Sequence, residues 1–179
     1  MGLAHGPADT LAVRAPECHR GRDWRYACRM SEEPASADCE LCAVPGGELL
    51  WENAFCRVVR VTDASGRAFP GSCRVIVKRH VAEMSDLDPA ESHHLMDAVL
   101  ATERALRKAL QPHKINLASL GNMVPHLHWH VIPRWRDDSH FPAPLWAAAQ
   151  RTAAPHMTVA SDDLRLAIVA ELSTVTNLP

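Results

Sequence analysis

The segment "VPHLHWHVIPR", residues 124 to 134, alternates histidines with large apolar side chains. Successive side chains of a β-strand point to opposite faces of the sheet, so the alternation predicts a strand with one buried face. The buried face would carry Leu127, Trp129 and Val131, and the other His126, His128 and His130. Thr, Lys or Glu would serve equally well on a merely solvated face. Three imidazoles therefore indicate chemistry, either as nucleophiles or as metal ligands.

Other short segments, rich in Val, Ile, Phe and Cys, predict the rest of a sheet. Residues 48–52, 55–61 and 72–78 have the pattern of an antiparallel meander, with a turn-rich connection at 62–71. Residues 114–120 and 127–134 add two further strands, joined by "GNMVP".

Two helices are expected beside these strands. Asp88 as N-cap, Pro89 at the first helical position and Glu91 three residues after the cap indicate a helix start. The apolar face of this long helix would comprise Leu95, Val99, Leu106 and Leu110, supported by Met96 and Leu100. A final helix is expected over residues 161–175, capped by Ser161. The fold class is therefore α+β: an antiparallel meander with one long helix packed on it, plus a C-terminal helix.

The length of 179 residues is that of one ordinary domain. Residues 1–37 show no helical or strand period and are interpreted as a disordered extension, with Met30 as an alternative start. The domain is placed at residues 38–150, and residues 151–179 form a tail that carries the last helix.

Composition excludes several classes of partner. Lys and Arg number 19 against 21 Asp and Glu, so no basic surface indicates nucleic acid or an anionic membrane. No apolar run approaches the ~20 residues that span a bilayer, and no secretion signal is seen. We therefore expect a cytoplasmic protein whose six cysteines are free thiols or metal ligands rather than disulfides.

Cys39 and Cys42 in "CELC" have the spacing with which two thiolates bind one ion. A redox role would need a thioredoxin-like βαβ setting, which is absent, and two unligated thiols are the other alternative. The three histidines of one strand do not easily surround the same ion, because alternate positions are about 6.5–7 Å apart. At most one or two of them should join such a site.

The string from His126 to Ile132 resembles the pattern His-apolar-His-apolar-His-apolar-apolar of the histidine triad, or HIT, family. Pro133-Arg134, the upstream "INLASLGN" and the distance from "VIVKRH" resemble that family as well, over about residues 39 to 135. The resemblance implies a HIT-like fold, usually a homodimer, that hydrolyses or transfers nucleoside monophosphate groups without an organic cofactor.

By this resemblance His128 would attack the α-phosphorus and form a covalent nucleotidyl-histidine, with His130 orienting His128 and the phosphate oxygens. A main-chain carbonyl bonded to the other nitrogen of His128 would fix the reactive tautomer. Asn116 and Asn122 resemble neutral groups that bind the substrate, and Asp63 resembles the acidic residue that bonds the ribose hydroxyls. Turn formation is the alternative for all three residues.

The zinc-bearing branch of the family, which includes uridylyltransferase relatives, implies a second use for the first histidine. His80 and His126 would complete a four-ligand site with Cys39 and Cys42. Full coordination leaves no open position, so this zinc would be structural. His126 would then hold the metal while His128 and His130 act on the phosphate.

Two rival functions remain open. One is a nucleotide-binding sensor or scaffold with little turnover, and the other is a hydrolase driven by an open zinc. Retention of all three histidines favours a hydrolase over a nucleotidyltransferase.

Overall fold

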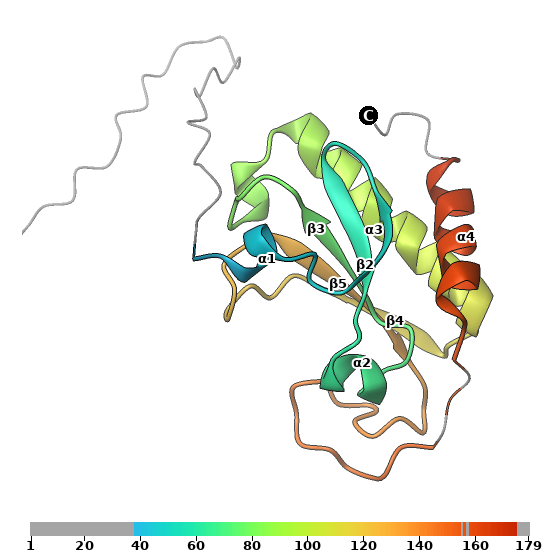
Figure 1. The fold of residues 1–179 in the computed structure, drawn as a ribbon. Coiled ribbons are helices and arrows are strands. Elements are labelled where there is room, and N and C mark those ends of the chain that lie inside the picture. The colour runs from blue at the N-terminus through green and yellow to red at the C-terminus, as the bar shows by residue number, and fades with distance from the viewer. Residues whose placement is uncertain (1–37, 155, 157, 175–179) are drawn as a thin grey trace, which may run out of the picture. The chain divides into compact units, whose positions relative to one another are not determined.

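The structure is a computed structural model that describes residues 38–154, 156 and 158–174. The predicted extension, residues 1–37, lies outside the described residues. Five strands form a sheet with the spatial order β1-β2-β3-β5-β4, in which every neighbouring pair is antiparallel (Figure 1). The strands are β1 (Glu48–Glu52), β2 (Cys56–Arg60), β3 (Cys73–Val77), β4 (Lys114–Ala118) and β5 (His128–Arg134). The predicted meander is confirmed, and the histidine strand β5 lies inside the sheet between β3 and β4.

Helix α3 (Pro89–Leu110) begins as the sequence predicts. The Asp88 carboxylate accepts a hydrogen bond from the Glu91 amide, and the Glu91 side chain accepts one from the Asp88 amide. This reciprocal capping box satisfies two amides that the first helical turn leaves without a partner.

One face of α3 packs on the sheet. The predicted core residues are all buried: Leu95, Val99, Leu106 and Leu110. Leu100 is a correction, because it is 38% exposed. Each helical residue advances by about 100°, so the neighbour of buried Val99 is turned toward solvent. The buried face is completed instead by Ala98, Ala101, Thr102 and Ala105.

Helix α4 (Ser161–Leu172) packs against α3, and the two lie side by side in Figure 1. Leu164, Ile168 and Leu172 of α4 enter the same apolar core as α3 and the sheet. The prediction of Ser161 as N-cap is wrong, since Ala160 occupies that position and makes no side-chain capping bond.

Ser161 is the first helical residue and ties α4 to the sheet instead. Its hydroxyl donates to the Glu48 carboxylate at 2.7 Å and accepts from Arg60 at 3.0 Å. These tertiary partners compete with local capping, which is why the capping prediction fails.

Part of the opposite face of the sheet is covered by a short helix in a segment that shows no helical period. Helix α1 (Glu40–Ala43) brings Cys39 and Leu41 onto Val59 and Ile76, which form a small apolar cluster. Helix α2 (Ala64–Ala68) is capped by Asp63, and the 3₁₀ turn η1 (Met84–Asp86) precedes α3. Much of the remaining histidine face is left for a site.

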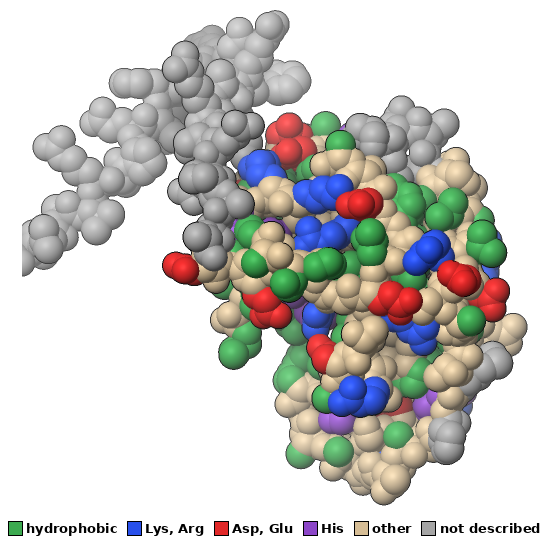
Figure 2. Space-filling view, in the orientation of Figure 1, with side chains coloured by type: hydrophobic (Ala, Val, Ile, Leu, Met, Phe, Trp, Pro, Cys, Tyr) green, Lys and Arg blue, Asp and Glu red, His purple; other side chains and the backbone are tan. Residues whose placement is uncertain are grey.

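Charged side chains of both signs share the visible surface. On the face shown in Figure 2, Lys and Arg side chains are interspersed with Asp and Glu. Among the described residues, no helix is both long and apolar enough to cross a bilayer.

Candidate active site and metal centre

Four sequence-predicted ligands meet at one point. Cys39 is the N-cap of α1 and Cys42 lies near its end, while His80 follows β3 and His126 precedes β5. Their ligand atoms all lie within 4.8 Å of one another, so the cluster could hold a metal ion. The Sγ atom of Cys42 is 3.3 Å from His80 Nδ1 and 3.5 Å from His126 Nδ1, and Cys39 Sγ is 3.4 Å from His126 Nδ1.

The ring of His126 is oriented for such a role. Its Nε2 lies 2.6 Å from the carbonyl oxygen of Val77. A carbonyl can only accept, so Nε2 carries the proton and Nδ1 presents its lone pair to the cluster. Burial lowers the pKa of His126, which favours the neutral ring that a metal needs.

Arg57 holds the segment that carries the two cysteines. From β2 its guanidinium donates to three main-chain carbonyls at the end of α1: those of Leu41 at 2.5 Å, Pro45 at 2.9 Å and Val44 at 3.3 Å. A four-residue helix has few hydrogen bonds of its own, so this side chain supplies much of its anchorage. Sequence reasoning missed Arg57, although an arginine beside the apolar residues of this strand was a visible signal.

His128 has the tautomer that the sequence analysis anticipated. Its Nδ1 is 2.6 Å from the carbonyl oxygen of His126, so Nδ1 carries the proton and Nε2 has a free electron pair. That Nε2 lies 3.1 Å from Nε2 of His130.

Both imidazoles are neutral at physiological pH. Burial lowers the pKa of His128, the hydrogen bond to the His126 carbonyl opposes this shift, and Arg74 adds to it. Burial, followed by the charges of His128 and Arg74, lowers the pKa of His130 to about 4. A neutral ring is the form in which imidazole is a nucleophile.

A pocket of about 430 Å³ opens over these two histidines. Asp63 and Asn122 line it, together with Arg74. Its apolar lining comes from α1 and from the loop before β5, and includes Leu41, Leu120 and Val124. The volume falls within the range of about 300–1,000 Å³ typical of small-molecule sites.

Asp63 has the local role that its sequence allowed and also lines the pocket. As N-cap of α2 it accepts from the amides of Ser65 and Gly66, and it also faces the pocket. The hydrogen bond from the Ser65 side chain is the largest contribution that lowers the pKa of Asp63, so the carboxylate is charged.

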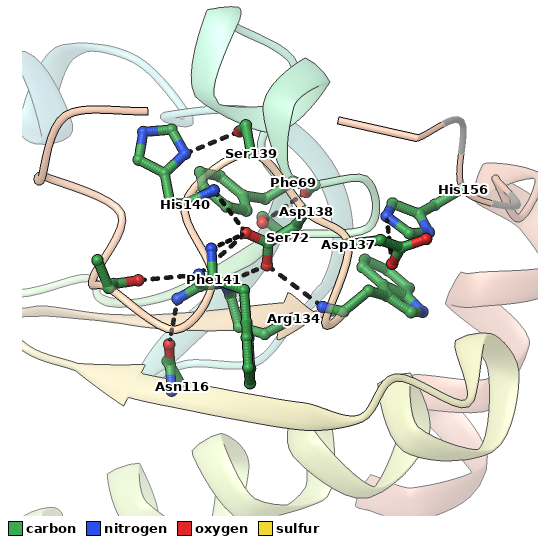
Figure 3. Close-up of polar contacts among 12 residues, drawn as sticks. Phe69, Ser72, Asn116, Arg134, Asp137, Asp138, Ser139, His140, Phe141 and His156 are labelled. Atoms are coloured by element: carbon green, nitrogen blue, oxygen red, sulfur yellow. Dashed lines mark hydrogen bonds and ion pairs between the residues drawn. The ribbon is translucent and has the colours of Figure 1, made fainter. Parts of the chain in front are cut away.

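Asn116 has a different environment from that predicted for a substrate ligand. It lies on β4 opposite Ile132, on the same face as His130, but it does not line the pocket. Its Oδ1 accepts from Arg134 at 2.8 Å (Figure 3). A role in substrate binding therefore stays a prediction.

Arg134 lies at the centre of the cluster in Figure 3. Its guanidinium pairs with the buried carboxylate of Asp138 at 2.7 and 3.1 Å and lies over the rings of Phe69 and Phe141. Asp138 also accepts from the amides of His140 and Phe141, which folds the loop after β5 back onto the end of the strand.

Comparison with known proteins decides the family. The family model described as the HIT domain matches residues 53–137. The chain contains a HIT domain. Solved relatives of this domain include a histidine triad protein from Bradyrhizobium japonicum, which is 25% identical to this chain with a TM-score of 0.52. The match covers 71% of this chain and 90% of that protein. Another, from Marinobacter aquaeolei, is 23% identical with a TM-score of 0.57 over 76% of this chain and 96% of that one, and shows the shared fold.

Two relatives of the HIT domain have named activities. An "AP-4-A phosphorylase" from Mycobacterium tuberculosis is 35% identical over 78 residues, 40% of each chain. A "Bis(5'-nucleosyl)-tetraphosphatase [asymmetrical]" from Schizosaccharomyces pombe is 32% identical over 74 residues, 38% of this chain and 41% of the relative. The chain thus spans about two fifths of the length of the curated relatives it matches.

Proposed function

We propose that the HIT domain acts at the α-phosphate of a nucleotide through a covalent nucleotidyl intermediate on His128. The observation that carries the proposal is the bond from His128 Nδ1–H to the His126 carbonyl, because it leaves the Nε2 electron pair beside a pocket. The names of the two sequence relatives, both of which concern dinucleoside tetraphosphates, support the substrate class.

The reaction has two steps. In the first, the Nε2 electron pair of His128 forms a bond to the α-phosphorus while the bond to the leaving group breaks, and the leaving group takes up a proton from the solvent. In the second, water attacks the same phosphorus and releases a proton to the solvent, while the P–N bond breaks and its electrons return to Nε2. Two displacements of this kind replace one harder displacement. If an acceptor other than water attacked in the second step, the protein would be a transferase. We propose that the acceptor is water and that the protein is a hydrolase.

His130 supports both steps as a neutral donor. With its proton on Nε2, it can donate to His128 before attack and to a phosphate oxygen afterwards. Asn122 is a second neutral group in the pocket, and Asp63 is the proposed partner of the ribose hydroxyls.

We propose that the metal is zinc and that its role is structural. Tetrahedral zinc with Zn–S near 2.3 Å and Zn–N near 2.0–2.1 Å separates a sulfur from a nitrogen by about 3.6 Å. Three of the four sulfur–nitrogen distances are 3.3, 3.4 and 3.5 Å, which fits that ion. Two thiolates and two imidazoles fill the coordination sphere, so the ion would join α1 to the histidine strand and leave the chemistry to His128.

The homodimer and the cytoplasmic location implied by the sequence stay predictions. Sedimentation at micromolar concentration tests the first, since a monomer there would contradict it.

The proposed reaction is tested by intact mass after brief incubation with an adenosine 5′-phosphoramidate. We expect a transient adduct of one AMP on the wild-type protein and none on His128→Asn. Release of AMP without any adduct would contradict the covalent step. Binding of AMP with neither adduct nor turnover would favour the nucleotide sensor.

A further inference from the structure

Arg74 is a charged side chain in the lining of the pocket that the proposed reaction does not use. It is the second residue of β3, directly opposite His130 of β5, on the same face of the sheet. Side chains paired in this way are neighbours, with Cβ atoms about 4.5–5.5 Å apart. Arg74 therefore lies beside His130 in the lining of the pocket.

The guanidinium of Arg74 makes two hydrogen bonds. Nη1 donates to the carbonyl of Gly46 at 3.0 Å, and Nη2 donates to Oδ2 of Asp63 at 3.3 Å. The Nε–H is buried and has no hydrogen-bond partner among the described residues. One of the two bonds anchors the side chain to the main chain, and the other reaches the carboxylate that caps α2.

The two carboxylate oxygens of Asp63 have different hydrogen-bond partners. Oδ1 accepts three hydrogen bonds, from the amide and hydroxyl of Ser65 at 2.8 and 2.6 Å and from the amide of Gly66 at 3.2 Å. Oδ2 has only Arg74 as a described partner. With a single partner, Oδ2 retains a lone pair that can accept a hydrogen bond from a ligand.

We propose that Arg74 is a specificity-determining residue that holds Oδ2 of Asp63 ready for a ribose hydroxyl, so that the pocket selects ribonucleotides over 2′-deoxyribonucleotides. The inference rests on the proposed function, in which Asp63 binds the ribose. Arg74 acts through Asp63 and is a positioning residue.

Charge provides the second part of the argument. A nucleotide phosphate at His128 is negative, and an uncompensated carboxylate in the same pocket would repel it. Arg74 lines the pocket together with the two histidines, and its guanidinium forms an ion pair with Asp63 at 3.3 Å. It compensates the carboxylate while leaving Oδ2 able to accept, which a neutral residue at position 74 would not do.

The variants are expected to fold. The Asp63 side chain is 55% exposed and that of Arg74 21% exposed, and exposed ion pairs contribute little to folding stability. Asn is as good an N-cap as Asp, so Asp63→Asn keeps the cap of α2 while removing the charge.

The experiment is calorimetric titration of the holoprotein with AMP, GMP, CMP and UMP, and then with the 2′-deoxy counterpart of the tightest binder. We expect the wild type to prefer the ribonucleotide at least about tenfold, the size of one hydrogen bond to a charged group. Asp63→Asn and Arg74→Met should each reduce the preference to less than about threefold. Arg74→Met should have no further effect on the preference in the Asp63→Asn background. Arg74→Lys keeps the positive charge but loses the planar guanidinium that donates from two nitrogens. Its preference for the ribonucleotide should lie between those of the wild type and Arg74→Met.

Arg104→Met is the matched control, because Arg104 pairs with Glu171 between α3 and α4 and is remote from the pocket. It should leave the preference unchanged. A wild type that binds ribo- and deoxyribonucleotides equally would overturn the inference while the proposed function stands, and so would Arg74→Met with the full preference retained. A wild type that binds none of the four monophosphates would overturn both.

Discussion

The Nδ1 atom of His128 lies 2.6 Å from the main-chain oxygen of His126, two residues earlier in the chain. The same His126 directs its own Nδ1 to the cysteine cluster and its Nε2–H to the carbonyl of Val77. One residue thus orients both the candidate metal centre and the candidate nucleophile. The contact to His128 is made by the main-chain oxygen of His126. The His126 side chain therefore affects the orientation of His128 only by fixing the position of that backbone.

Removal of zinc should lower the stability of the fold before it affects chemistry. Structural zinc is coupled to folding, so a chelator is expected to lower the melting temperature of the wild type by at least about 10 °C, an effect of several kcal/mol. Cys42→Ser should melt at the lower temperature and be insensitive to the chelator. Zinc per chain and thermal unfolding are measured on the same samples.

Cys56→Ala is the control for this experiment. Cys56 is buried in the core, and burial raises the pKa of its thiol to about 12, so it is not poised to bind metal. The variant should keep one zinc and its response to the chelator. If chelation abolished turnover and left the melting temperature unchanged, the metal would be catalytic.

Arg57 should control how tightly the metal is held. Arg57→Met removes three hydrogen bonds to the end of α1, which carries Cys42. We expect zinc to transfer to a chromogenic chelator about 10–100-fold faster than from the wild type, the range seen for residues that orient metal ligands. Arg165→Met, which loses one bond to the Leu49 carbonyl on the outer strand, is the comparison and should release zinc at the wild-type rate.

His130 should make the protein less stable in mild acid. Its pKa is about 4 in the fold against 6.5 for an unperturbed histidine, so between these values the unfolded chain binds more protons. Stability therefore falls as the pH drops from about 6.5 toward 4. Urea unfolding at pH 7 and pH 5 should show that the wild type loses about 1–2 kcal/mol more than His130→Gln. Equal losses would mean that His130 titrates normally.

The strands and the long helix were predictable because their signals are local. Two-residue alternation defines β5, and a cap, a proline and an apolar stripe define α3. The four cluster residues were also predictable, since a two-residue cysteine spacing limits the geometry and the family resemblance supplied the histidines. Helix α1 was not, because four residues carry no period and depend on the tertiary bonds from Arg57.

The partners of polar side chains were the part that sequence could not supply. Asn116 was expected to bind the substrate, but its side chain accepts a hydrogen bond from Arg134. Ser161 was expected to cap a helix, but its hydroxyl donates to Glu48. Arg74 was overlooked as an ordinary strand residue. Each depends on which strands lie side by side, and the strand order with β5 between β3 and β4 is not written in any local pattern.

The Arg134–Asp138 pair should be a major source of stability for the loop after the histidine strand. Both side chains are almost fully buried, at 2% and 1% exposure. Asp138→Ala leaves a buried guanidinium without its counter-charge and is expected to cost about 3–5 kcal/mol in urea unfolding. Asp162→Ala, which breaks the exposed pair with Arg165, should cost less than about 1 kcal/mol.

Acid should weaken the same pair over a defined range. Burial opposes the charge of Asp138, but the bond from Arg134 and those from the amides of His140 and Phe141 outweigh it and lower the pKa to about 2. The contribution is therefore complete above the ordinary pKa of 3.8 and is lost as the pH falls from there through about 2. Wild type and Asp138→Ala should converge in stability across that range.

A double variant, Arg134→Met with Asp138→Leu, should be more stable than Asp138→Ala at pH 7, because it also removes the buried positive charge that the single variant leaves unpaired. A double variant no more stable than the single one would show that Arg134 stabilises the loop mainly through Asn116 and the two phenylalanine rings.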